Sequence, residues 1–346
     1  MSHVLGRTDQ SGPTASLGSF LARDGSRGAD VSLDLDRPHV SLLAGKRGSG
    51  KSYTLGVLAE GIAAARGVTG VLIDPMGVFS GLADGADADV IDDPTVAADA
   101  LEPRDWCALL ELDPTSAAGA LFWQVAEEAA TLTGMLDAVE AAAVPDSVAR
   151  AVANHLALAA QWDVFHPDGL DAERLFGPSL TVVDATQLTD QALGVVTAAV
   201  ARTLYETAVS ESIPRLPWLM IDEAQAVVDG IAGRPLRTIL TRGRHPGVSL
   251  VLATQRPAAL PAVAISQSDL LLSHRLTATA DIDALAAARP TYIDESIRDR
   301  LPDGVGEAVV IDDTTESAVT VQVRERRTPH GGDSPRVGDL PHDKTN

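Results

Sequence analysis

Short apolar runs of strand length alternate with helix-like segments over most of the chain. The runs are rich in Val, Leu and Ile, a composition typical of strands buried on both faces of a parallel sheet. Between them, apolar residues recur at helical spacing, as at Leu55, Leu58 and Ile62. The expected strands are 31–36, 40–44, 71–74, 180–184, 218–222, 248–253, 270–276, 308–311 and 318–323. This order predicts one doubly wound α/β domain over 37–325, with helices on both faces of a mainly parallel sheet.

Three segments fall outside this alternation. Residues 1–36 form an N-terminal lead-in that we expect to be partly flexible, with loop up to about residue 30 apart from one short strand. From 85 to 176, Ala, Leu and acidic residues at helical spacing predict an inserted helical subdomain. Residues 326–346 combine Pro, Gly and Asp without periodicity, which predicts a disordered tail.

The strand at 40–44 leads into a sequence that fits the phosphate-loop pattern G-x-x-x-x-G-K-[ST]. Glycines let backbone N–H groups approach phosphate oxygens, and the following helix points its positive end at the same anion. In this pattern Lys51 reaches the β- and γ-phosphates and the Ser52 hydroxyl binds Mg²⁺. A glycine-rich turn that fits by chance is the alternative, but both flanking elements favour a nucleotide site. The expected nucleotide contacts are Gly45, Lys46, Arg47, Gly48, Ser49, Gly50, Lys51, Ser52 and Tyr53.

Two adjacent carboxylates, Asp222 and Glu223, end the strand at 218–222. Ligands of open α/β sheets sit at the carboxyl ends of the strands. There Asp222 can hold Mg²⁺, and Glu223 can orient and deprotonate an attacking water. A kinase would need an acceptor site in place of the second carboxylate, so the pair favours hydrolysis. The alternative is an ordinary strand end with acids that begin a helix.

Gln255 follows the next strand, in the sequence Ala253-Thr254-Gln255-Arg256-Pro257. An amide at this position could contact the γ-phosphate and report its loss to the rest of the domain. Strands often end in polar residues before a proline, so this motif carries little weight by itself.

The chain is strongly acidic, with a net charge of -21 and only three lysines, Lys46, Lys51 and Lys344. Salt screens the self-repulsion of such a surface, and halophiles exploit this effect. We infer a salt-in cytoplasm, haloarchaeal or that of a cell hosting a haloarchaeal virus or plasmid. An acidic protein that avoids nucleic acid is the rival explanation, but it does not account for the scarcity of lysine. No apolar run approaches a membrane span and no signal peptide is apparent, so we expect a cytoplasmic protein.

A basic island interrupts this acidity. Between Gly230 and Gln267 there is no Asp or Glu. The segment contains His245 and five arginines, Arg234, Arg237, Arg242, Arg244 and Arg256. These residues could face the phosphates of a nucleotide bound by a neighbouring subunit, or nucleic acid. Alternatively, they pair with acids elsewhere in the fold.

Taken together, these motifs and their order resemble the HerA/FtsK group of RecA-like P-loop ATPases, which includes the VirB4 and TrwB type conjugation motors. The resemblance covers about 31–325 except the helical insertion. The matching residues are His39, the loop 45–52, Ile73-Asp74-Pro75 with Gly77, Ile221-Asp222-Glu223-Ala224, Gly243-Arg244 with Gly247, Thr254-Gln255-Arg256-Pro257 and Arg275.

The resemblance implies roles for several of these residues. Lys51 and Ser52 would bind phosphate and Mg²⁺, Asp222 would be the Walker B aspartate, and Glu223 the catalytic base. Gln255 would act as the sensor, and Arg244 would be the arginine inserted into the site of an adjacent subunit. Such motors are usually hexameric rings that move double-stranded DNA or another polymer.

Departures from the family pattern limit this inference. Where HerA-like proteins often read D-P-H-G-E, this chain has Met76 and Val78 in place of the His and the Glu. Only 44 residues precede the loop, which we expect to be too few for the N-terminal barrel of HerA. We therefore predict an Mg²⁺-dependent ATPase that forms homo-oligomers, has no membrane span and acts as a translocase or packaging motor on double-stranded DNA. The alternative is an ATP-driven switch or assembly ATPase that does not act on nucleic acid.

Overall fold

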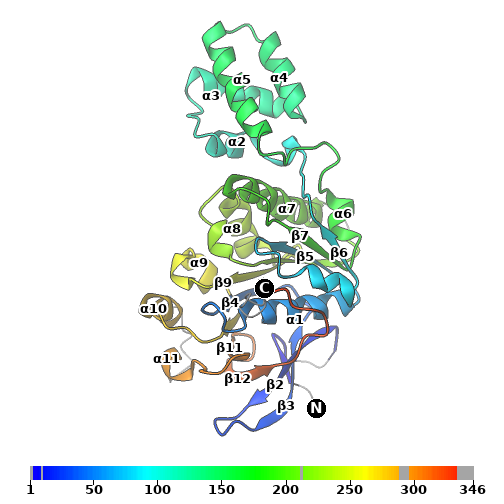
Figure 1. Ribbon diagram of the computed structural model, residues 1–346, viewed down its shortest axis with the longest axis vertical. Helices are drawn as coiled ribbons and strands as arrows, with labels where there is room; N and C mark the ends of the chain where they lie inside the picture. The colour runs from blue at the N-terminus through cyan, green and yellow to red at the C-terminus, as the bar shows by residue number, and fades with distance from the viewer. Residues whose placement is uncertain (1–2, 9–10, 211–212, 288–295, 333–346) are drawn as a thin grey trace, which may run out of the picture.

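The computed structural model describes residues 3–8, 11–210, 213–287 and 296–332, and is built on a single twelve-stranded sheet (Figure 1). The strands are β1 (His3–Leu5), β2 (Thr14–Leu21), β3 (Arg27–Asp34), β4 (Val40–Ala44), β5 (Val68–Asp74), β6 (Ala88–Ile91), β7 (Leu180–Asp184), β8 (Leu216–Ile221), β9 (Ser249–Thr254), β10 (Leu270–Ser273), β11 (Glu307–Asp312) and β12 (Ser317–Val323). Their order across the sheet is β1-β3-β2-β12-β11-β10-β4-β9-β8-β5-β7-β6. From β10 to β6, every neighbouring pair is parallel, which confirms the predicted fold class.

Helices cover both faces of the parallel strands. The α-helices are α1 (Lys51–Ala64), α2 (Pro103–Leu109), α3 (Ala117–Glu128), α4 (Leu132–Ala141), α5 (Asp146–Ala160), α6 (Ala172–Phe176), α7 (Asp190–Ser210), α8 (Gly233–Arg242), α9 (Ala262–Ser266), α10 (Thr279–Ala287) and α11 (Ile297–Arg300). Short 3-10 turns are η1 (Ser80–Asp84), η2 (Ala98–Ala100), η3 (Ala224–Ala226) and η4 (Pro257–Ala259).

The buried parallel strands divide their side chains between two apolar clusters. On β5, Val71 and Ile73 belong to the cluster that includes α7 and α8, whereas Leu72 belongs to the cluster that includes α1. All residues of β5 and of β9 are buried. Burial on both faces explains why these strands are continuous apolar runs rather than alternating ones.

The N-terminal lead-in is part of the sheet. The short strand predicted within it, around residues 17–21, is confirmed as part of β2, but the loop predicted for the rest of the segment is wrong where β1, the start of β2 and β3 lie. β2 and β3 form an antiparallel hairpin, and β2 pairs with β12. Ala15 and Leu17 on β2 are completely buried. At Gly18 a Cβ atom would lie 2.0 Å from the carbonyl oxygen of Gln322, so the pairing with β12 requires glycine there. The Gly and Ser residues that suggested loop are therefore part of the strand pairing.

The helical insertion is a lobe of α2, α3, α4 and α5 that projects away from the sheet at the top of Figure 1. Trp106 lies at the centre of the core of this lobe. The distance from the centroid of its indole ring to that of the Phe165 ring is 4.8 Å, and to that of the Phe122 ring 5.8 Å. Within the range 85–176 that sequence assigned to the insertion, β6 pairs with β7 as an edge strand of the sheet.

Residues 324–332, which we call the C-terminal strap, run along α1 as an ordered segment (Figure 1). Arg326 and Thr328 are partly or wholly buried there, and the backbone of Thr328 is hydrogen-bonded to Glu60 of α1. The predicted disorder is therefore wrong for 326–332. Residues 333–346 of the predicted tail lie outside the described residues.

Among the described residues, α7 alone is long and apolar enough to cross a membrane by length and composition. However, 61% of the relevant stretch is buried inside the fold. Its apolar face packs in the same cluster as β5 and α8, as expected for a core helix.

Candidate nucleotide-binding site

The phosphate loop connects the end of β4 to the beginning of α1. Gly48 and Gly50 adopt positive φ angles of 76° and 107°, which glycine allows without steric cost. A Cβ atom on Gly45 would lie 2.5 Å from the Ser49 hydroxyl oxygen. The loop is therefore shaped by its glycines, and the N–H groups of the first turn of α1 are available to an anion.

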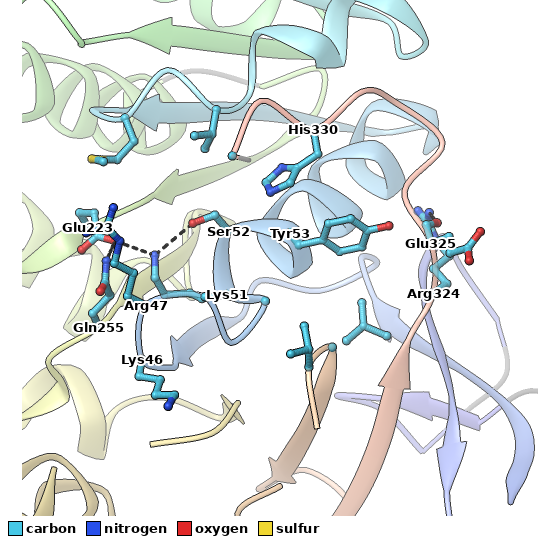
Figure 2. Close-up of a pocket in the computed structure, with 18 of the residues that line it drawn as sticks. Lys46, Arg47, Lys51, Ser52, Tyr53, Glu223, Gln255, Arg324, Glu325 and His330 are labelled. Atoms are coloured by element: carbon cyan, nitrogen blue, oxygen red, sulfur yellow. Dashed lines mark hydrogen bonds and ion pairs between the residues drawn. The ribbon is translucent and has the colours of Figure 1, made fainter. Parts of the chain in front are cut away.

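The sheet order brings the other predicted site residues to this loop. β9 lies between β4 and β8, and all three strands are parallel. The residues that follow their carboxyl ends therefore meet at one edge of the sheet. Gln255 follows β9, and Asp222 and Glu223 follow β8. Figure 2 shows Lys51, Glu223 and Gln255 grouped together on this edge.

Lys51 is held between the two carboxylates. Its ammonium group contacts Asp222 Oδ1 and lies 3.0 Å from Glu223 Oε1. The Ser52 hydroxyl donates a hydrogen bond of 2.8 Å to Asp222 Oδ2. Lys51 and Asp222 are only 4% and 1% exposed, so these charges interact with little screening by water.

Glu223 is an ionised carboxylate in this setting. Burial by itself raises its pKa, but the charge of Lys51 and hydrogen bonds from Gln255 and Gln225 lower the pKa below its usual value. Gln255 Nε2 donates to Glu223 Oε1 over 2.6 Å, and Gln225 Nε2 donates to Oε2 over 2.5 Å. Both carboxylate oxygens are thus oriented by amide groups. Glu223 also has a positive φ of 49°, a backbone conformation that is uncommon outside glycine and clusters at functional sites.

Gln225 was not among the predicted site residues. Its side chain connects the two strands: Nε2 binds Glu223, and Oε1 accepts a 2.6 Å hydrogen bond from the Thr254 hydroxyl. It lies in the same short sequence as Asp222 and Glu223, so its position was visible in the sequence. Its role depends on a contact with the neighbouring strand, and that contact was not visible in the sequence.

His274 supports the loop from behind and was also missed. It is completely buried; Nδ1 lies 2.7 Å from the carbonyl oxygen of Glu307 and Nε2 lies 2.9 Å from the Thr54 hydroxyl. Burial lowers the pKa of His274 to about 4, which makes it a neutral imidazole. Nδ1 therefore donates to the carbonyl, and Nε2 accepts from Thr54 on α1. No local sequence signal distinguishes this histidine.

A cavity of about 540 Å³ opens over the loop (Figure 2). This volume lies in the range of small-molecule sites. Of the nine expected nucleotide contacts, Gly45 and Ser49 do not line the cavity, because both are buried. The lining residues that the sequence did not suggest come from the loop after β5, from the ends of β11 and β12 and from the C-terminal strap, and are Met76, Val78, Val305, Gly306, Gln322, Val323, Arg324, Glu325, His330 and Gly332.

Arg244 is not brought to this cavity. It is exposed in the turn that precedes β9, whereas Gln255 follows the same strand. The two residues therefore lie at opposite ends of the parallel strands, Arg244 at the amino ends and Gln255 at the carboxyl ends. Within one chain, Arg244 is separated from the site that contains Lys51.

The basic island divides into paired and unpaired arginines. Arg234 forms a 2.8 Å ion pair with Glu102, at the beginning of the helical lobe. Within the described part of the chain, no ion pair is found for the other arginines of the island, which are Arg237, Arg242, Arg244 and Arg256. Pairing with acids elsewhere in the fold thus explains one of the five.

The donor atoms at the loop suit a hard divalent cation. The Ser52 hydroxyl oxygen and the Asp222 carboxylate oxygen are 2.8 Å apart, at the end of the phosphate loop. Mg²⁺ prefers such oxygen ligands and usually keeps several waters and phosphate oxygens in its shell. Ser52 and Asp222 therefore fit the predicted metal site.

Comparisons with known proteins agree with this geometry. A family model described as the central domain of the helicase HerA matches residues 15–157, from β2 to α5, which includes the phosphate loop but not Asp222. VirB4 of Thermoanaerobacter pseudethanolicus is 18% identical, with a TM-score of 0.69 over 93% of this chain and 99% of that one. The plasmid coupling protein TrwB, in complex with ADP and Mg²⁺, is 16% identical, with a TM-score of 0.61 over 93% of this chain and 98% of that one.

At these identities the two structures establish a common fold. A search of curated protein sequences found no match. The partial match to the HerA family model, the shared RecA-like fold and the phosphate loop beside Asp222 and Glu223 together support the resemblance of this chain to P-loop ATPases of the HerA/FtsK type.

Proposed function

We propose that this protein hydrolyses ATP to ADP and phosphate in an Mg²⁺-dependent reaction. The observation that carries the proposal is the cluster of Lys51, Asp222, Glu223 and Gln255 at the edge of the phosphate loop. All of these except Asp222 line a cavity large enough for a nucleotide. The ADP and Mg²⁺ of the TrwB complex support the choice of ligand.

The chain supplies distinct groups for each part of the reaction. The loop amides and Lys51 would hold the phosphates and stabilise the charge that develops on the transferred group. Glu223 would accept the proton of a water as its oxygen attacks the γ-phosphorus and the bond to the bridging oxygen breaks. A lowered pKa keeps Glu223 in the ionised form that this step requires. Gln255, bonded to the same carboxylate, would orient Glu223 and sense the γ-phosphate.

Ser52 and Asp222 would hold Mg²⁺. The ion, when bound, supplies positive charge to the β- and γ-phosphate oxygens. Lys51 interacts with the same Asp222 carboxylate, so the ammonium group must move toward the phosphates when the ion and nucleotide bind.

We further propose that the protein works as a homo-oligomer, with Arg244 reaching the nucleotide of a neighbouring subunit. Its exposed position at the ends of the strands opposite the phosphate loop supports this arrangement, because from there Arg244 cannot reach the nucleotide site of its own chain but is accessible to another copy. By resemblance the assembly is a hexameric ring. Arginines inserted in this way typically increase turnover by about 10³- to 10⁵-fold.

Double-stranded DNA is the proposed polymer, in a translocase or packaging and transfer motor. The unpaired arginines of the basic island support DNA as the polymer. The net charge of -21 instead favours the alternative, an assembly ATPase that does not act on nucleic acid. The discriminating experiment measures ATPase rates at several KCl concentrations, with and without double-stranded DNA. A translocase should be stimulated by DNA, and the absence of stimulation at every salt concentration would leave the assembly ATPase as the better proposal.

A further inference from the structure

The C-terminal strap lies in a groove whose centre is the carboxylate of Glu60 on α1. Glu60 Oε1 accepts hydrogen bonds from Arg327 N at 2.8 Å, from Thr328 N at 2.9 Å and from the Thr328 hydroxyl at 2.8 Å. Its other oxygen, Oε2, forms a 2.7 Å ion pair with Arg324. Burial alone raises the pKa of Glu60, but the hydrogen bonds from Thr328 and Arg324 lower it below its usual value. The strap is thus fixed by a buried, ionised carboxylate.

Glycines on both sides of the strap make room for it. A Cβ atom on Gly56 of α1 would lie 2.8 Å from the guanidinium carbon of Arg326. On the opposite side, a Cβ atom on Gly81 of η1 would lie 2.6 Å from the carbonyl oxygen of Pro329. A side chain at position 81 would collide with the strap backbone, whereas one at position 56 would displace the Arg326 guanidinium. The groove therefore holds the strap in one place over α1.

The strap carries an aromatic ring to the nucleotide cavity. His330 lies 5.4 Å from Tyr53 between ring centroids, at an interplanar angle of 81°, an edge-to-face arrangement. Arg326 fixes both rings: its backbone N–H donates to the Tyr53 hydroxyl over 2.6 Å, and Nη1 lies 3.0 Å from His330 Nδ1. A guanidinium nitrogen can only donate, so Nδ1 of His330 accepts this hydrogen bond.

The two ends of the cavity differ in chemistry. Lys51, Glu223 and Gln255 line the end that suits the γ-phosphate and the attacking water. Tyr53 follows Ser52 at the start of α1 and, with His330, lines the end away from those carboxylates (Figure 2). A nucleotide whose phosphates lie on the loop has its nucleoside at this second end. The nearby guanidinium of Arg324 is occupied by Glu60 and by backbone carbonyls.

We propose that Tyr53 and His330 form the nucleoside subsite of the cavity, where the two rings contact the base and sugar of a nucleoside triphosphate. The inference rests on the proposed function, because it takes the phosphates to bind the loop. Aromatic side chains stack on bases of any sequence, and both rings line the cavity. A segment that is remote in sequence from the phosphate loop would thereby take part in substrate binding.

The test compares two ligands on the full-length protein in Mg²⁺: ATP, and inorganic tripolyphosphate, which lacks a nucleoside. Equilibrium dissociation constants are measured for wild type, His330→Ala and Tyr53→Leu, with His155→Ala in the helical lobe as a matched control. Loss of one aromatic contact should weaken ATP binding by roughly two- to tenfold in both site variants. Tripolyphosphate binding should be unchanged in every variant, which also demonstrates that the loop is folded.

The outcomes separate this inference from the proposed function. Unchanged ATP affinity in His330→Ala, with normal tripolyphosphate binding, would refute the nucleoside subsite and leave the proposed ATPase intact. An equal loss of affinity for ATP and for tripolyphosphate would also refute the nucleoside subsite, because His330 would then act only by supporting the phosphate loop. A wild-type protein that binds neither ligand would refute the proposed function, and the subsite with it.

Discussion

The buried ion network at the N-terminal edge of the parallel strands makes stability depend on pH. His39, which precedes β4, is 4% exposed and lies between two carboxylates. Nδ1 is 2.8 Å from Asp269 Oδ2, and Nε2 is 3.2 Å from Asp34 Oδ2. Asp34 also forms a 3.0 Å ion pair with Arg7. The network joins the N-terminal hairpin to the core of the sheet.

The magnitude follows from the pKa of His39. Burial by itself lowers that pKa, but hydrogen bonds to Asp269 and Asp34 outweigh burial and raise the pKa from 6.5 to about 9. A raised folded-state pKa stabilises the fold fully below the unfolded value of 6.5, and this stabilisation is lost as the pH rises through about 9. At about 1.4 kcal/mol per pH unit, the contribution to the free energy of unfolding is about 3 kcal/mol.

The assay is urea unfolding of wild type and His39→Gln at pH 6 and at pH 9.5. Other groups titrate in this range, so the quantity to compare is the difference in unfolding free energy between the two proteins at each pH. We expect wild type to lose about 3 kcal/mol more than the variant between the two pH values. A difference that stays constant with pH would refute the reasoning, because it would mean that His39 is not protonated in the folded protein.

Further predictions concern the site and the surface. Glu223→Gln should retain ATP binding but lower turnover by about 10²- to 10⁴-fold in a single-turnover assay, and unchanged turnover would remove Glu223 as the base. Arg244→Ala should lose ATPase activity and regain it in rings mixed with Glu223→Gln subunits; mixtures that never regain activity would contradict action in trans. In urea unfolding, wild type should lose stability as the pH falls from 6.5 to about 4, because the buried His274 resists protonation in the folded protein. His274→Phe should not show this pH-dependent loss. Because the net charge is -21, the thermal midpoint should rise with KCl between about 0.1 M and about 2 M, and a midpoint independent of salt would contradict the halophilic interpretation.

The sequence was most informative where structure is local. The phosphate loop, the apolar strand before it and the helix after it are contiguous, so one pattern predicted all three. The carboxyl ends of parallel strands meet at one edge, and this rule was enough to bring Asp222, Glu223 and Gln255 to the loop. Continuous apolar runs likewise predicted the strands that are buried on both faces.

The sequence was uninformative where a segment depends on a distant partner. The strap resembles a disordered tail in composition, and its order comes from Glu60, which is 268 positions away from Thr328. β2 contains Gly18 because its backbone closely approaches β12 there. His274 has no neighbouring motif, and its neutral state follows only from complete burial. Such contacts become visible only when the chain is folded.

The position of β9 has a mechanical consequence for the proposed assembly. The strand is six residues long, or about 20 Å, and is completely buried between β4 and β8. Arg244 lies just before it and Gln255 just after it. In a ring of such subunits, this single buried strand would connect Arg244, which reaches a neighbouring subunit, with Gln255, which contacts Glu223 in the same subunit. A displacement at one ATP site would then be transmitted to the next site through a single strand, which provides a direct route for neighbouring subunits to hydrolyse ATP in sequence.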